Sequence, residues 1–178
     1  SGTNNFAGLI TLGAASTISA DIGTLNLTHA GTITGATFGL TLAGSSNGSI
    51  ASIIGITTGA VTKNGTGTWT LKGVNTSTGA ITVNAGTLKL GDGSTGSWST
   101  APGLTFTGSG TFEFAGNTTA KVQALGVLTL TSGGGTLRVA IPPDGINGVT
   151  FNSLAPPSLG SALDIVSPFD TSVTIGGT

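Results

Sequence analysis

The chain has 178 residues, of which 32 are glycine; 6% are charged, with five Lys/Arg against six Asp/Glu and a formal net charge of −1. This weak and balanced charge provides no basic surface for nucleic acid or for anionic membranes, so neither is an expected partner. Because 37% of the residues are hydrophobic, disorder is also excluded as a prediction, since disordered chains combine low hydrophobicity with high net charge.

Short triplets of an apolar, a polar and an apolar residue recur along the whole chain. Their period of two predicts short β-strands with the apolar residues inside and the polar residue, usually threonine, outside. Glycine-centred turns such as Lys63-Asn64-Gly65 and Asp92-Gly93 separate the triplets. In chain order the triplets are 10–12, 25–27, 40–42, 69–71, 81–83, 88–90, 104–106, 112–114, 128–130, 137–139, 149–151 and 173–175.

Regular short strands fit a sandwich, a barrel or a solenoid, and internal repetition favours the solenoid. Residues 2–16 align without a gap with residues 73–87, at an offset of 71, mainly through turn glycines and inward apolar residues. A unit this short cannot bury its apolar face unless neighbours stack on it. We therefore predict an all-β fold, a single parallel β-solenoid of about eight coils and roughly 40 Å in length.

The predicted solenoid divides into regular coils over residues 1–140 and looser, proline-containing terminal coils of the same domain over 141–178. Residues 141–170 hold five of the six prolines. Proline cannot donate a hydrogen bond to a central strand, so Pro142-Pro143 and Pro156-Pro157 are expected in loops or at an edge. The chain begins with Ser1 and contains no methionine, and we expect a piece of a longer, processed protein.

Residues 61–91 contain four short motifs in order: Lys63-Asn64-Gly65, Gly67-Thr68-Trp69-Thr70-Leu71, Gly73-Val74-Asn75-Thr76-Ser77-Thr78-Gly79 and Ala85-Gly86-Thr87-Leu88. Together they resemble the autotransporter-associated β-strand repeat of bacterial passenger proteins, with a weaker copy at 2–19. The departure is Ser77, where the family usually has an aromatic residue. The resemblance implies a right-handed parallel β-helix, export to the cell surface or the medium, and a role as stalk, adhesin or filament.

Residues suited to catalysis are few and far apart, so we expect no catalytic, cofactor-binding or metal-binding residues and no cofactor. No two acids are closer than six positions, which gives no local carboxylate pair for glycoside hydrolysis or for calcium. His29 is the single histidine, expected in a solvated turn, and there is no cysteine to complete a transition-metal site. The acids are Asp21, Asp92, Glu113, Asp144, Asp164 and Asp170.

Three functions remain open at this point. In the leading hypothesis the chain is a non-catalytic, extracellular rod at a bacterial surface, which continues into further repeats or joins other copies end to end, because its terminal strands lack charge. A carbohydrate-active β-helix instead predicts that three or more acids converge with Arg138 on one face. A carbohydrate-binding adhesin would use surface glycans as partners, with Trp98 in a polar loop stacking on a sugar ring and Trp69 in the core.

Overall fold

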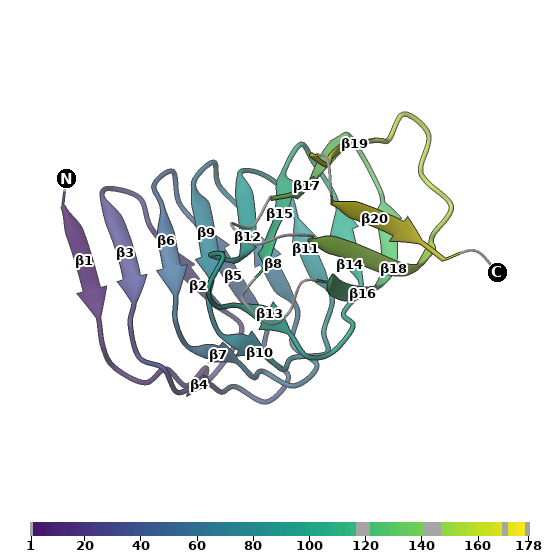
Figure 1. Cartoon of the computed structure of the whole chain (residues 1–178). Helices are drawn as coiled ribbons and strands as arrows, with labels where there is room; N and C mark the ends of the chain where they lie inside the picture. Colours follow the sequence, from purple (N-terminus) through teal and green to yellow (C-terminus); the bar gives the residue numbers. More distant parts are fainter. Residues whose placement is uncertain (1, 117–121, 141–146, 169–170, 177–178) are drawn as a thin grey trace.

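The computed structural model describes residues 2–116, 122–140, 147–168 and 171–176, and these residues form strands and connections without a helix (Figure 1). No membrane-crossing helix occurs among them. All strand pairs are parallel, and the chain winds through the same sides of a coil again and again. The predicted parallel β-solenoid is confirmed.

Two large sheets of eight strands each form opposite sides of the solenoid. In stacking order, sheet 1 consists of β1 (Thr3–Phe6), β3 (Thr24–Leu27), β6 (Gly48–Ile50), β9 (Thr68–Leu71), β12 (Thr87–Gly91), β15 (Thr111–Gly116), β17 (Gly134–Val139) and β19 (Ala162–Val166). Sheet 2 consists of β2 (Ser16–Ser19), β5 (Leu40–Ala43), β8 (Val61–Lys63), β11 (Ile81–Val83), β14 (Leu104–Phe106), β16 (Val122–Leu130), β18 (Gly148–Leu154) and β20 (Ser172–Ile175).

A third side closes the coil with two short pairs, β4 (Thr32–Ile33) with β7 (Ile53–Ile54) and β10 (Val74–Asn75) with β13 (Ser97–Trp98). One coil thus runs from sheet 1 through the third side to sheet 2. The stacking register gives its length: Asn4 pairs with Leu25, 21 residues later, and Leu25 pairs with Gly48, 23 residues later. A coil therefore takes 21 to 23 residues at this end of the solenoid.

The predicted alternation of apolar and polar residues holds in strands of the middle coils, such as β5, β9 and β11. In β5, Leu40 and Leu42 are buried and Thr41 between them is half-buried, because successive side chains of a strand point to opposite faces. Equivalent inward residues from successive coils stack into continuous columns that form one core. The core is largest in the middle coils, where Trp69, Phe106 and Phe112 are almost completely buried.

The sequence alignment of residues 2–16 with residues 73–87 predicts that residues 71 positions apart occupy equivalent places in the solenoid, and this prediction is wrong. Three coils after Asn4, the same place in sheet 1 is occupied by Trp69, so the equivalent offset there is 65. Asn75, the residue matched to Asn4 by sequence, lies on the third side. Every corner of the coil uses similar glycine turns and apolar triplets, so the sequence match aligned one corner with a different one.

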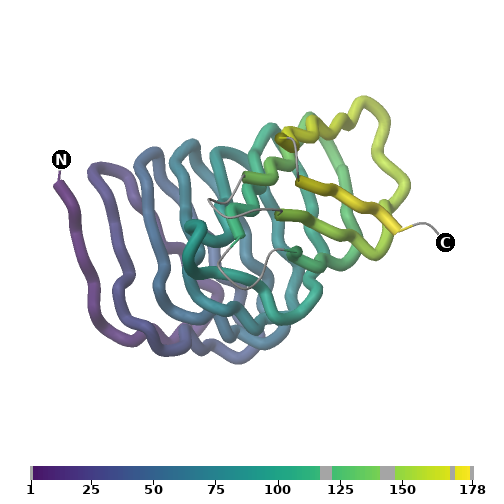
Figure 2. The backbone as a smooth tube through the Cα atoms, viewed as in Figure 1, coloured from purple at the N-terminus to yellow at the C-terminus, as the bar shows by residue number. Residues whose placement is uncertain are grey.

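The terminal strands β18, β19 and β20 continue both large sheets. Pro156 and Pro157 lie in the connection between β18 and β19, as expected of proline, and Figure 2 shows this connection projecting beyond the coils. Pro142 and Pro143 lie outside the described residues. The first strand, β1, and the last, β20, lie at opposite ends of the solenoid.

Candidate functional site

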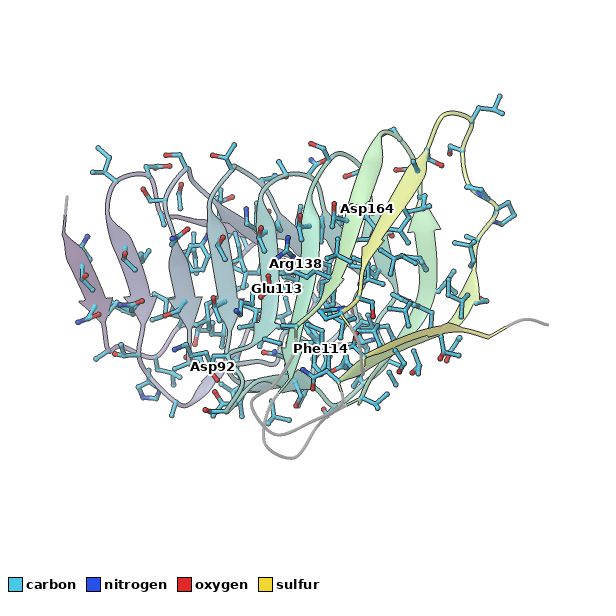
Figure 3. The ribbon with its side chains drawn as sticks, turned by 45° about the horizontal axis from the view of Figure 1, so that its top comes forward. Asp92, Glu113, Phe114, Arg138 and Asp164 are labelled. Atoms are coloured by element: carbon cyan, nitrogen blue, oxygen red, sulfur yellow. The ribbon has the colours of Figure 1, made fainter. Side chains whose placement is uncertain are left out.

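Charged side chains from successive coils line up in one column on the outer face of sheet 1. In β15, Phe112 and Phe114 point inward, which turns Glu113 outward. The register places Glu113 between Lys89 on one neighbouring strand and Arg138 on the other. Its carboxylate lies 2.8 Å from the Lys89 Nζ atom and 3.9 Å from the Arg138 Nε atom, and Figure 3 labels the Glu113–Arg138 pair.

The other described acids do not join this ion-paired group. Asp164 lies on β19, where it pairs with Thr136 rather than with Arg138. Asp21 lies in a connection after β2 and accepts a hydrogen bond from the Ser19 hydroxyl at 2.7 Å. Asp144 and Asp170 lie outside the described residues.

Asp92 forms a closed turn of its own after β12. Its Oδ1 atom accepts hydrogen bonds from the backbone N–H groups of Ser94 at 3.0 Å and Thr95 at 2.8 Å, and Lys72 lies 3.4 Å away. Burial acts to raise the pKa of Asp92, but these two N–H groups and the Lys72 ammonium together lower it below its usual value. Asp92 is therefore a charged turn residue.

This arrangement supports ion pairing more than acid–base chemistry. Glu113 lies between two cations, and the described part of the chain has no pocket that would shield a substrate from water. No group of three or more histidines or acids among the described residues is placed to hold a metal ion. A carbohydrate-active site would require at least three acids beside Arg138 on one face. Of the acids that the structure describes, Glu113 and Asp164 lie on the strands that flank Arg138 in sheet 1.

His29 is half-buried in the connection between β3 and β4, whereas the sequence predicts a solvated turn. Its Nδ1 atom accepts a hydrogen bond from the Gly31 N–H at 2.8 Å, and its backbone carbonyl accepts one from the Ser52 hydroxyl of the next coil. Within the described part of the chain, neither of these hydrogen bonds involves a carboxylate.

Trp98 does not lie in an exposed loop, which overturns the prediction of a sugar-stacking tryptophan. It belongs to β13, is 4% exposed, and its Nε1 atom donates to the Ser77 carbonyl at 2.7 Å. Ser77 is itself buried, with a hydroxyl that has no hydrogen-bond partner. Where the repeat usually carries an aromatic residue, the indole of the following coil thus covers the serine.

The third side depends on buried amide side chains, which sequence reasoning did not single out. The Oδ1 atom of Asn75 accepts from the Ile54 N–H at 2.9 Å, and its Nδ2 atom donates to the carbonyls of Gly73 and Ser97. Gln123 repeats this role two coils later by bonding the N–H and the carbonyl of Trp98. These amides satisfy backbone groups of neighbouring coils where strand pairing is short.

Lys63 is a fully buried cation inside the solenoid. In β8, Val61 and Lys63 point into the core and Thr62 between them points outward. Its Nζ atom donates to the carbonyls of Asn64 at 2.7 Å, Gly65 at 2.7 Å and Ala85 at 3.1 Å. Burial lowers the pKa of Lys63 to about 8. We call these three oxygens the carbonyl cage; it ties the turns of two successive coils together.

Both ends of the described stack leave apolar side chains uncovered. At the first coil, all four residues of β1 are exposed, and Phe6 is 47% exposed. At the last coil, Ile165 is 45% exposed and Ile175 is 38% exposed, although their columns are buried one coil earlier. The end strands also present one edge without a neighbouring strand.

Comparison with known proteins gives one family match. The model of the family described as passenger-associated-transport-repeat matches residues 61–90. No curated protein and no solved structure matches the chain. The repeat together with the β-solenoid fits an autotransporter passenger repeat protein, a family of structural repeats that implies a secreted or surface location.

Proposed function

From the premise that a passenger-associated-transport-repeat at residues 61–90 forms consecutive coils of a β-solenoid, we propose that the chain is a non-catalytic structural rod of an exported bacterial surface protein. Its coils would extend a stalk, and its ends would be covered by adjacent repeats or by other copies. The observation that carries this proposal is the pair of uncovered ends, each with exposed core residues and an open sheet edge.

The repeat motif itself supports a mechanical role. Its Lys63, Trp69 and Asn75 are all fully buried and bond backbone groups of their own and neighbouring coils. Residues that serve a ligand would instead face a pocket or the solvent. The motif therefore encodes how one coil stacks on the next.

Electron microscopy of the purified chain, combined with sedimentation, tests the version in which copies join end to end. We expect filaments or short linear oligomers. Ile175→Lys should abolish them, because a charge on the last strand blocks pairing with another edge. Val74→Lys is the matched control: Val74 is 50% exposed on the side of the rod, away from both ends, and this variant should still assemble.

If the chain remains as single rods at high concentration, copies do not assemble end to end. Adjacent repeats would then be the proposed partners that cover the two ends. Cleavage of a polysaccharide by the purified chain, lost in Glu113→Gln, would contradict the non-catalytic part of the proposal.

A further inference from the structure

The outer face of sheet 2 presents a threonine at the same position of six successive coils. The strand register pairs each of these residues directly with the next, from β2 to β16. The resulting column, which we call the threonine column, consists of Thr17, Thr41, Thr62, Thr82, Thr105 and Thr129. Because all six lie on parallel strands in register, their side chains repeat at the strand spacing of about 4.8 Å.

The hydroxyl groups of the threonine column have no side-chain hydrogen bond to the described part of the protein. Polar side chains in the neighbouring column behave differently. There the Asn84 Nδ2 atom donates to Asn64 at 3.0 Å, and the Thr107 hydroxyl donates to Asn84 at 2.5 Å. The threonine column therefore offers methyl and hydroxyl groups to the solvent, in a fixed array.

The same face carries no charge over these six coils. On one side the threonine column is flanked by Ala15, Gly39, Ala60, Ala80, Gly103 and Val127, and on the other by Ser19, Ala43, Asn64, Asn84, Thr107 and Thr131. Lys63, the one charged residue of these strands, points into the core. The ion pairs of Lys72, Lys89 and Arg138 are made on or beside sheet 1.

We propose that the outer face of sheet 2 binds crystalline water, that is, the surface of ice. A crystal surface repeats in two dimensions, so only a protein surface that repeats with a fixed period can meet it at many points together. Hydroxyl groups can complete hydrogen bonds with ordered water almost as well as with protein groups. Methyl groups between them exclude mobile water, and the absence of charge avoids strongly hydrated groups that would disrupt the lattice.

Two other occupants fit this face less well. Five strand spacings of about 4.8 Å and a width of about 13 Å give an area of about 300 Å², well below the roughly 800 Å² per partner of a stable protein interface. A second copy is therefore disfavoured. A polysaccharide surface is disfavoured because the three columns contain no aromatic ring that could stack on a sugar.

The test uses the whole chain, frozen slowly from dilute solution, and measures its incorporation into ice and its effect on ice growth below the melting point. The wild-type chain should enter the ice and lower the freezing point relative to the melting point. Thr82→Lys, in the middle of the threonine column, should lose both effects. Thr87→Lys is the matched control: Thr87 is an equally half-buried outward threonine, but it lies on sheet 1, so this variant should keep both effects.

Circular dichroism and thermal unfolding of both variants establish that each is folded. Should Thr82→Lys fail to fold, Thr82→Val takes its place, since it replaces only the hydroxyl by a methyl group. A wild-type chain that is excluded from ice overturns the proposal. Equal activity in Thr82→Lys and the wild type, or equal loss in Thr82→Lys and Thr87→Lys, also overturns it. A dimer that Thr82→Lys dissociates, without any effect on ice, would assign the face to a second copy instead.

Discussion

A cation in the core of the solenoid is stabilised by backbone rather than by an acid. The Nζ atom of Lys63 reaches carbonyls in the turns after β8 and β11, so one side chain fixes two turns. A buried polar group that keeps its hydrogen bonds is tolerated in a core, whereas the loss of its partners is costly. The position of Lys63 in the repeat motif thus has a structural explanation.

Lys63 should make the stability of the fold depend on pH above neutrality. Its pKa is about 8 in the folded protein and 10.5 in an unfolded chain. Between these values the unfolded chain binds a proton that the folded chain releases, so the free energy of unfolding should rise with pH, by at most about 3 kcal/mol. Urea unfolding at pH 7, 9 and 10.5 measures the rise. Lys63→Met should lack this rise; a fall in the wild type relative to Lys63→Met would contradict the prediction.

Asn75 should be one of the most sensitive residues of the third side. Asn75→Leu removes the acceptor of the Ile54 N–H and the donors to Gly73 and Ser97, all in a buried place. Buried backbone groups without partners cost about 1–3 kcal/mol, so a loss of about 3 kcal/mol is expected in urea unfolding. Asn84→Leu, at an exposed position, should change stability by less than about 1 kcal/mol. Similar losses in the two variants would argue against the amide network.

Sequence reasoning found part of this residue-scale chemistry. The alternation in Val61-Thr62-Lys63 already places Lys63 inward, but a lysine at an apolar position is easily interpreted as a turn residue. Trp98 was assigned to a loop because Ser97 and Ser99 are polar, yet Ser97 is buried too. A strand of two residues is too short to show the alternation that distinguishes an inward from an outward side chain.

At the scale of strands, the columns of the core balance large and small residues. Gly48 in β6 lies directly against Trp69 in β9, and a Cβ atom at Gly48 would lie 2.5 Å from the indole ring. The indole cannot move freely, because its Nε1 atom donates to the Ala43 carbonyl at 2.9 Å. Position 48 therefore requires glycine, because any larger side chain would overlap with the Trp69 indole of the next coil.

Gly48→Ala should destabilise the fold by about 1–3 kcal/mol through overpacking. In the background of Trp69→Leu, which opens space in the same column, the same substitution should cost much less. A double-mutant cycle in urea measures this coupling. Gly39→Ala is the control, because its added Cβ atom would meet only the Ala60 carbonyl at 3.5 Å. Additive effects of the two substitutions would show that Gly48 and Trp69 do not compete for space.

The strands were predictable from sequence, but their assignment to the sides of the coil was not. Triplets such as 40–42, 81–83 and 104–106 all became buried strands of sheet 2. On the third side this signal is interrupted: Ile33 and Ile54 are buried there, but in later coils the amides of Asn75 and Gln123 take the inward places. Because different sides of the coil carry similar apolar triplets, the sequence does not fix the phase of the repeat, and it predicts an offset of 71 where the structure has 65.

At the scale of the whole molecule, each coil pairs only with the coils directly before and after it. Stability in such a stack is close to a sum of contributions from single coils and from neighbouring pairs. The end coils have one neighbour among the described coils and exposed core residues, whereas the middle coils have two. The resistance to local opening should therefore increase from both ends toward the middle.

Hydrogen exchange followed by mass spectrometry measures this gradient along the chain. The slowest amides are expected in β8 to β12, and the fastest strand amides in β1 and β20. Leu71→Ala, at a residue that is 1% exposed, should cost about 2–5 kcal/mol and accelerate exchange in the coils on both sides. Ile175→Ala, at the exposed end, should accelerate exchange only in its own coil and the one before it. Uniform acceleration throughout the chain in the end variant would mean that the solenoid unfolds as one cooperative unit, and that stability is not carried from neighbour to neighbour.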